Sequence, residues 1–341
     1  MSKISRRGIL AAAGTALAAD KLGFPMIRSA RAAEFTLKFA SDIPVTHPLN
    51  VRMKEATEEI LKATDGRVQI GMYPNNQLGG DPDMFSQLRA GALDFFTLSG
   101  ANVLSGLVPK AAISGVGFAF KDARQVHEAM DGDLGAFVRR QIEHAGIDVL
   151  DKIWENGFRQ ITTSTKPVRG PADLVGMKIR VPPGQLWVSL FKALKAAPAT
   201  ISWNEAYTAL QTKIVDAQEN ALTTIYVAKV YEVQKYCSMT NHMWDGFWFL
   251  MNRNSWKKLP SAMQEIVAKY VNGAALKERQ DVIDQDASLQ KTLEQKGLVF
   301  NTTNPQEFRD ELKKSGFYGE WRKSFGDQEW SLLEKVTGPL A

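Results

Sequence analysis

Two arginines of this chain lie in surroundings that suit the binding of an anion. Arg180 lies between Ile179 and Val181, near the end of a segment expected to form a buried strand. An unpaired guanidinium group is costly to bury, and ligands of open α/β sheets bind outside the carboxyl ends of the strands. The planar guanidinium group fits a carboxylate through two hydrogen bonds. These residues leave two interpretations open: Arg180 and Arg159 bind a carboxylate ligand, or both make structural ion pairs.

Signatures of enzymatic chemistry are missing from the sequence. It contains none of the patterns G-x-G-x-x-G, G-x-x-x-x-G-K-[ST] and G-x-S-x-G, which mark dinucleotide sites, phosphate-binding loops and serine nucleophiles. The four histidines are scattered, without the spacing of metal ligands. Cys237, the single cysteine, lies in an apolar stretch and is expected to be a small buried residue. The sequence therefore predicts no catalytic residue, no metal and no cofactor.

The N-terminus has the pattern of an export signal. Arg6 and Arg7 precede a short apolar run, and residues 30–32 form an A-x-A cleavage pattern, as in twin-arginine signal peptides. We therefore expect residues 1–32 to be removed and the mature protein to be periplasmic; a disordered basic tail is the alternative. These residues carry a net charge of +5, equal to the +5 of the whole chain. The remainder is close to neutral and gives no support for a nucleic-acid partner.

Periodic patterns predict two α/β units in tandem. In the first half, apolar residues indicate strands near 35–39, 68–72 and 93–98, with helices after Pro48 and over 81–90. In the second half, strands are expected over 177–181 and 214–220, and helices around 186–194, after Ser202 and over 227–234. Ser202 and Glu205 have the spacing of a capping box. Strands that alternate with helices imply a parallel sheet.

Two similar segments join these units. Residues 154–158 and 244–248 each place a glycine among bulky aromatic residues. Glycine permits the dihedral change of a hinge, and the aromatic residues would then lie in a cleft between two domains; two ordinary turns are the other interpretation. Aromatic residues in the cleft would favour a flat or apolar acid as ligand. The aromatic residues near the expected cleft are Trp154, Phe158, Trp187, Trp203, Trp244, Phe247 and Trp248.

Residues 260–295 are predicted to form one long helix. The pattern is helical throughout, without an internal proline, and Gly273 is its one weak point. This length suits a helix that lies across two domains better than a helix packed in a single core. A further helix is expected over 305–314, with Asn304 as its cap.

Longer motifs make the sequence resemble the binding subunits of TRAP transporters, the DctP-type family. The likeness runs over nearly all of the mature chain, and its most specific parts are the strand with Arg180 and the Gln-Glu-Asn segment. The motifs are Trp154-Glu155-Asn156-Gly157-Phe158-Arg159, Gly176-Met177-Lys178-Ile179-Arg180-Val181-Pro182, Asp216-Ala217-Gln218-Glu219-Asn220, Tyr231-Glu232-Val233-Gln234-Lys235-Tyr236 and Leu78-Gly79-Gly80-Asp81.

The resemblance implies a periplasmic-binding-protein-like α/β fold. Two domains would close over an organic acid in the cleft between them, and the long helix would span both. Domain I would comprise residues 33–156 and 246–285, and domain II residues 157–245 and 286–341.

The resemblance also implies the residues that contact the ligand. Arg180 falls on the family's carboxylate-binding arginine, Arg159 on a second arginine near the ligand, Asn220 on a contacting asparagine, and Trp203 on an aromatic position of the wall. The family usually has glycine where this chain has Ala217, which puts the position of Asn220 in doubt.

Capture without chemistry is the function that the resemblance implies. The protein would bind a small carboxylate by hinge closure and deliver it to the membrane-embedded permease subunits of a TRAP transporter. Two alternatives stay open: a periplasmic binding module for a sensor or another transporter class, and a periplasmic enzyme exported by the twin-arginine route.

Overall fold

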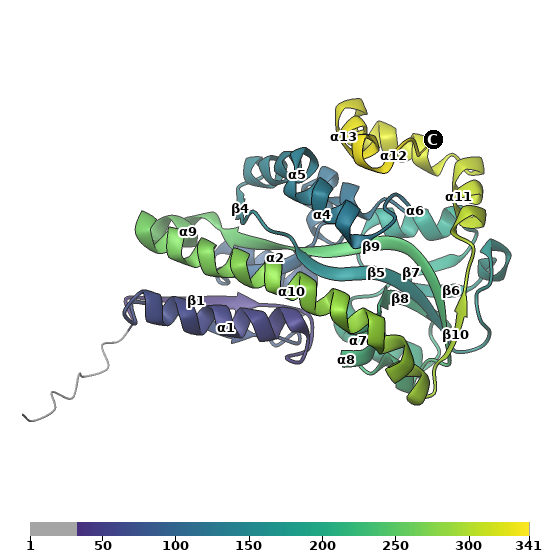
Figure 1. The fold of residues 1–341 in the computed structure, drawn as a ribbon, viewed down its shortest axis with the longest axis horizontal. Helices are drawn as coiled ribbons and strands as arrows, with labels where there is room; N and C mark the ends of the chain where they lie inside the picture. The colour runs from purple at the N-terminus through teal and green to yellow at the C-terminus, as the bar shows by residue number, and fades with distance from the viewer. Residues whose placement is uncertain (1–32, 341) are drawn as a thin grey trace, which may run out of the picture. The chain divides into compact units, whose positions relative to one another are not determined.

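The computed structural model describes residues 33–340, so the predicted signal peptide lies outside the described part of the chain. Within it, ten strands form one sheet in the order β2-β1-β3-β9-β5-β8-β6-β7, and β4 and β10 also pair with β9 (Figure 1). The strands are β1 (Phe35–Ala40), β2 (Val68–Tyr73), β3 (Phe95–Ser99), β4 (Ile147–Val149), β5 (Trp154–Thr163), β6 (Lys178–Val181), β7 (Ala197–Thr200), β8 (Ala217–Ala221), β9 (Tyr236–Asn252) and β10 (Val299–Thr302).

Helices cover the sheet, and their ends follow local sequence signals. Helix α2 begins after Gly80, whose N–H donates to Asp83 at 3.1 Å, and ends at Gly91 in the left-handed conformation (φ 79°). The helices are α1 (Pro48–Ala63), α2 (Asp81–Ala90), α3 (Leu104–Leu107), α4 (Ala123–Asp131), α5 (Asp133–His144), α6 (Gln185–Ala193), α7 (Trp203–Gln211), α8 (Leu222–Val227), α9 (Arg253–Lys258), α10 (Ser261–Gln295), α11 (Pro305–Lys314), α12 (Phe317–Phe325) and α13 (Asp327–Thr337). Within the described range no helix is both long and apolar enough to cross a membrane.

Strands β5 and β9 connect two groups of strands. One group consists of β1, β2, β3 and β4, and the other of β6, β7, β8 and β10. β9 pairs with β3 and β4 through its last residues and with β10 through its first residues. β5 runs antiparallel to β9, with Trp154 opposite Phe247 and Phe158 opposite Trp244. The two glycine-bearing segments therefore lie inside paired strands, and their interpretation as ordinary turns is wrong.

Three details of the sequence prediction need correction. The sheet is mixed rather than parallel, because β5 and β9 run antiparallel to each other and to their neighbours β8 and β3. Ser202 does precede α7, but its side chain makes no capping hydrogen bond, so the predicted capping box is not formed. The helix expected over 227–234 lies earlier, as α8 at Leu222–Val227, and only a short 3₁₀ turn follows at Val230–Glu232.

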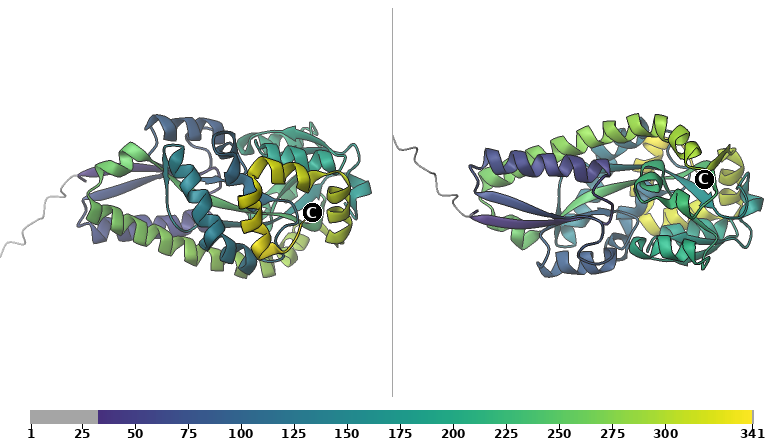
Figure 2. Two further views of the ribbon diagram at one scale, coloured as in Figure 1. Left: turned by 90° about the horizontal axis from the view of Figure 1, so that it is seen from above. Right: turned by 90° about the horizontal axis from the view of Figure 1, so that it is seen from below.

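The long helix α10 packs along both groups of strands. It contacts α1, β5, α8 and β10, and it runs past α1 and across β5 (Figures 1 and 2). Its bounds, Ser261–Gln295, confirm the predicted helix over 260–295. Nothing lies within 4 Å of the position that a Cβ atom would take at Gly273.

Buried carboxyl groups gather where α10 packs against β5. Glu278 of α10 accepts the backbone N–H of Glu155 at 2.9 Å, and its second oxygen has no partner. Burial, followed by the nearby charge of Glu155, raises the pKa of Glu278. Burial also raises the pKa of Asp286 to about 7, against the opposing hydrogen bond from Thr223. His127 and Trp244 complete the cluster, each hydrogen-bonded to Glu155.

We expect Asp286→Asn to reduce the pH dependence of stability. The folded-state pKa of about 7 exceeds the ordinary value of 3.8, so the folded chain binds more protons than the unfolded chain between these values. The free energy of unfolding should therefore fall as pH rises from about 4 to 7, by at most about 1.4 kcal/mol per pH unit for this group. Urea unfolding of both proteins at several pH values measures the difference; equal slopes would contradict the assignment.

Two glycines should respond oppositely to alanine. Gly157 has φ 111°, which L-residues rarely adopt, and lies at a β-bulge in β5. Gly157→Ala should lower the free energy of unfolding by roughly 1–3 kcal/mol. Gly273→Ala, in a helix and in open space, should raise it by about 0.5–1 kcal/mol. Urea unfolding measures both; a neutral Gly157→Ala would show that this backbone is not constrained.

The C-terminal helices pack back over the first half of the chain. Gln125 of α4 donates to the carbonyl of Val336 in α13 at 2.8 Å, and Tyr318 of α12 donates to the carbonyl of Gly117 at 3.1 Å. Lys110 and Glu329 form an ion pair between the same regions. The predicted domain boundaries, which assign residues 286–341 to domain II, stay a prediction.

Candidate functional site

A small cavity lies where the two groups of strands meet β5 and β9. Its volume is about 30 Å³, enough for ordered water but too small for an organic acid. A ligand therefore requires the walls to separate before it enters. The wall consists of Asp42, Ile43, Asp81, Ser99, Asn102, Asn156, Arg159, Arg180, Pro182, Trp187, Trp203, Asn220, Thr224, Asp245 and Phe247.

Arg180 is a buried cation without an ion-pair partner among the described residues. It lies on β6, between Ile179 and Val181, and its Nε donates to the carbonyl of Ile201 at 2.8 Å. Nη1 is buried without any partner, and burial lowers the pKa of the guanidinium group to about 10. A protein anion does not complete this site, so a bound anion can do so.

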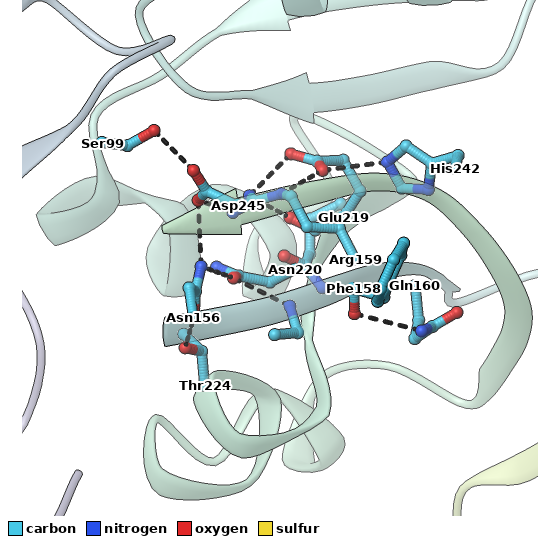
Figure 3. A network of polar contacts seen from close by, with 12 residues as sticks. Ser99, Asn156, Phe158, Arg159, Gln160, Glu219, Asn220, Thr224, His242 and Asp245 are labelled. Carbon is cyan, nitrogen blue, oxygen red and sulfur yellow. Dashed lines mark hydrogen bonds and ion pairs between the residues drawn. The ribbon is translucent and has the colours of Figure 1, made fainter. Parts of the chain in front are cut away.

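Arg159 has the opposite surroundings. It lies on β5 and donates to Glu219 through Nε (2.5 Å) and Nη2 (2.8 Å), and to Asp245 through Nη1 (2.7 Å) (Figure 3). Burial by itself lowers the pKa of Arg159, but the two carboxylates raise it above its ordinary value. His242 also contacts Glu219, at 3.1 Å. Arg159 therefore lines the cavity while its charge is already compensated.

Asn220 belongs to a hydrogen-bonded layer beside Arg159. Its Oδ1 accepts from Nδ2 of Asn156 at 3.3 Å and from the N–H of Ala221 at 2.9 Å (Figure 3). Asn156 also donates to Asp245 at 3.0 Å and accepts from Thr224 at 2.8 Å. The acceptor of Asn220 is thus occupied, whereas its Nδ2 donates to no described residue. This amide remains able to donate into the cavity.

Trp203, at the start of α7, lies against the predicted carboxylate site. The guanidinium carbon of Arg180 is 5.3 Å from the centre of its ring, a distance at which a cation and an aromatic face attract. Trp187 of α6 has the same relation to Arg159, also at 5.3 Å. The structure therefore brings all four predicted contact residues to one cavity.

Most of the aromatic residues that the sequence placed near the cleft belong elsewhere. Trp187, Trp203 and Phe247 line the cavity, but Trp154, Trp244 and Trp248 are buried in the hydrophobic core, and Phe158 packs against that core. The remaining wall is mainly polar. The expectation of a flat or apolar ligand therefore depends on three aromatic residues rather than seven, and it stays a prediction.

Acidic residues are the part of the site that the sequence did not predict. Asp81, the first residue of α2, accepts from Asn102 at 2.7 Å through Oδ2, while its Oδ1 is buried without a partner. Burial raises the pKa of Asp81 to about 6. The same effect, followed by the charge of Asp81, raises the pKa of Asp42. An aspartate in a first helical turn is ordinary by sequence, so only the fold reveals its second role.

The fold and the buried, unpaired guanidinium of Arg180 together define a site that can bind a small anion. Residues 39–316 match the family model DctP, described as bacterial extracellular solute-binding protein, family 7. The match covers most of the chain, so the protein belongs to this family of periplasmic solute-binding proteins, which is not an enzyme family.

Solved structures and curated relatives agree with this assignment. A TRAP periplasmic solute-binding protein from Roseobacter denitrificans with bound L-galactonate has a TM-score of 0.83 and 27% identity, covering 90% of this chain and 99% of that one. Another, from Sulfurospirillum deleyianum with bound succinate, has a TM-score of 0.83 and 26% identity, with the same coverage. Uncharacterized protein y4mM of Sinorhizobium fredii is 36% identical over 84% of this chain. The matched region covers only 52% of the length of that protein. The two-domain periplasmic-binding-protein-like fold is thereby confirmed.

Proposed function

We propose that this protein captures a small organic acid through Arg180, by closure of the cleft, and delivers it to the permease subunits of a TRAP transporter. The observation that carries the proposal is the guanidinium of Arg180: it is buried in the cavity wall, unpaired, and has one nitrogen without any partner. Relatives with bound succinate and L-galactonate support an acid as the ligand. Asn220 and one N–H of Arg159 add donors, and Trp203 lies against the carboxylate site.

The mechanism needs no bond to be made or broken. In an open form the cavity wall is hydrated, and the acid docks on Arg180. Closure excludes water and is favoured because contacts to both walls exist only in the closed form. Closure would bring the predicted domains I and II together about the crossing strands β5 and β9, with α10 spanning both.

The location follows the same proposal. Residues 1–32 act as a twin-arginine signal, and the mature protein meets its permease at the outer face of the cytoplasmic membrane. Replacing Arg6 and Arg7 together by lysine should leave the precursor in the cytoplasm; cell fractionation measures this. Continued export would assign the segment to another route.

A ligand screen tests the capture itself. Residues 33–341 are melted in the presence of organic acids and of the primary amide of each acid. A ligand at 100 times its dissociation constant should add about 2.7 kcal/mol of stability. Acids that raise the melting temperature while their amides do not support the arginine site; equal effects of acids and amides would contradict it.

A further inference from the structure

The cavity wall has one unsatisfied acceptor as well as unsatisfied donors. Among its described side-chain atoms, Nη1 of Arg180, Nε1 of Trp187 and Oδ1 of Asp81 are buried without a hydrogen-bond partner. Arg180 and Asp81 each expose 1% of their surface. A ligand carboxylate satisfies the donors, but it cannot satisfy the aspartate oxygen, because both groups only accept hydrogen bonds.

Asp81 is held in place by the protein rather than free to turn away. Asn102 donates to Oδ2 at 2.7 Å, and the residue begins α2, whose first turn is fixed by the hydrogen bond between Gly80 and Asp83. Oδ1 is therefore held within the wall. The carboxylate of Asp42, in the same wall, accepts no hydrogen bond from another side chain of the described residues, whereas the backbone carbonyl of Asp42 accepts from Asn76 at 2.8 Å.

The other acids at the site have their partners within the protein. Asp245 accepts from Ser99 at 2.5 Å, and also from Asn156 and Arg159. Glu219 accepts from Arg159 and contacts His242. Asp81 and Asp42 thus remain as the acidic groups of the described wall without an ion pair, although the charge of Arg180 on the same cavity acts to lower the pKa of both against the larger effect of burial.

We propose that the ligand carries a hydrogen-bond donor, hydroxyl or ammonium, in addition to its carboxylate, and that Oδ1 of Asp81 accepts from this donor. A methyl group at that position would leave the aspartate oxygen unpaired once closure has excluded water. A second carboxylate would place like charges together beside Asp81 and Asp42. The site therefore selects hydroxylated or amino acids over plain alkanoic and dicarboxylic acids of the same length. This inference rests on the proposed carboxylate capture and specifies the substrate class.

The wild-type protein provides the first test. Calorimetry compares two sets of acids of equal length. The four-carbon set is butanoate, erythronate, 4-aminobutanoate and succinate; the six-carbon set is hexanoate, galactonate, 6-aminohexanoate and adipate. Erythronate and galactonate carry a hydroxyl on every carbon beyond the carboxylate, so the position of the donor need not be known. The donor-bearing acids of one length should bind roughly 10- to 100-fold tighter than the alkanoate and the dicarboxylate.

Asp81→Asn provides the second test. The amide oxygen can still accept from Asn102, and the amide nitrogen then presents a donor to the cavity in place of an acceptor. The preference for hydroxylated or amino acids over the dicarboxylate should fall at least about tenfold or reverse. Asp83→Asn is the matched control, because it removes the same charge from the same helical turn at an exposed position, and its amide oxygen can still accept the N–H of Gly80. It should leave the preference unchanged, and melting curves of both variants check folding.

The outcomes distinguish a failure of this inference from a failure of the proposed carboxylate capture. If no acid of either length binds, carboxylate capture fails, and the inference fails with it. If acids bind but succinate, adipate or an alkanoate binds tightest, capture stands and the role of Asp81 is wrong. Tightest binding of the hydroxylated series identifies the donor as a hydroxyl, and tightest binding of the amino series identifies it as an ammonium group.

Discussion

Replacing Arg180 by methionine is expected to remove acid binding while leaving the fold intact. The acid would then be buried without its cation, which should cost about 3–5 kcal/mol of binding free energy. The unbound protein should not suffer, because burial of an unpaired guanidinium already lowers its pKa to about 10. Methionine keeps the apolar length of the side chain and places no charge in the wall. Calorimetry measures the affinity, and urea unfolding without ligand measures the stability.

Arg180→Lys tests whether acid binding needs only a positive charge or also the paired N–H groups of the guanidinium. Lysine retains the positive charge but loses the paired N–H groups, so binding should be intermediate between wild type and Arg180→Met. Unchanged affinity in Arg180→Met would remove this residue from the site. A folding defect comparable to the binding defect would return Arg180 to a structural role.

Replacing Arg159 by methionine should have the reverse effect. Its guanidinium compensates Glu219 and Asp245, which are both buried. Its loss would leave two carboxylates uncompensated and should lower the free energy of unfolding by about 3–5 kcal/mol. Urea unfolding without ligand measures this loss. A loss of no more than about 0.5 kcal/mol, which is ordinary for a surface substitution, would contradict the structural role.

A double variant separates the network from simple loss of packing. Glu219→Gln removes one of the two charges that Arg159 compensates, so Arg159→Met and Glu219→Gln together should cost less than the sum of the single losses. Additive losses would show that the pair is not coupled. In that case only the binding affinities of the variants would distinguish the role of Arg180 from that of Arg159.

The sequence predicted the fold well where the signals were local. The long helix, α2 with Gly91 at its end and the Asn304 cap of α11 all follow from residues within one turn of each boundary. The helix placed over 227–234 was wrong because several apolar residues there pack as a loop beside α8 rather than as one helical face. The direction of β5 and β9 depends on pairing across the chain, which no local pattern encodes.

The candidate site likewise contains some residues that the sequence could indicate and others that only the fold reveals. For Arg180, residue type and position left ligand binding and a structural ion pair both open, and the resemblance to the DctP-type family favoured ligand binding. That Arg159 is already paired could not be predicted, since Glu219 and Asp245 lie 60 and 86 residues away in sequence. The sequence did not predict Asp81 as a site residue, because its place in the first turn of a helix already accounted for an aspartate there. Its partnerless oxygen is a property of the folded wall alone.

Cys237 makes the closing motion accessible to spectroscopy. The single thiol lies on β9, fully buried, and burial raises its pKa, so it should resist alkylation by maleimide dyes. Two further cysteines, Val45→Cys and Val175→Cys, would lie at positions that are 59% and 61% exposed. A donor and an acceptor fluorophore attached there can report the distance between the predicted domains I and II in single molecules, with the native thiol left in place.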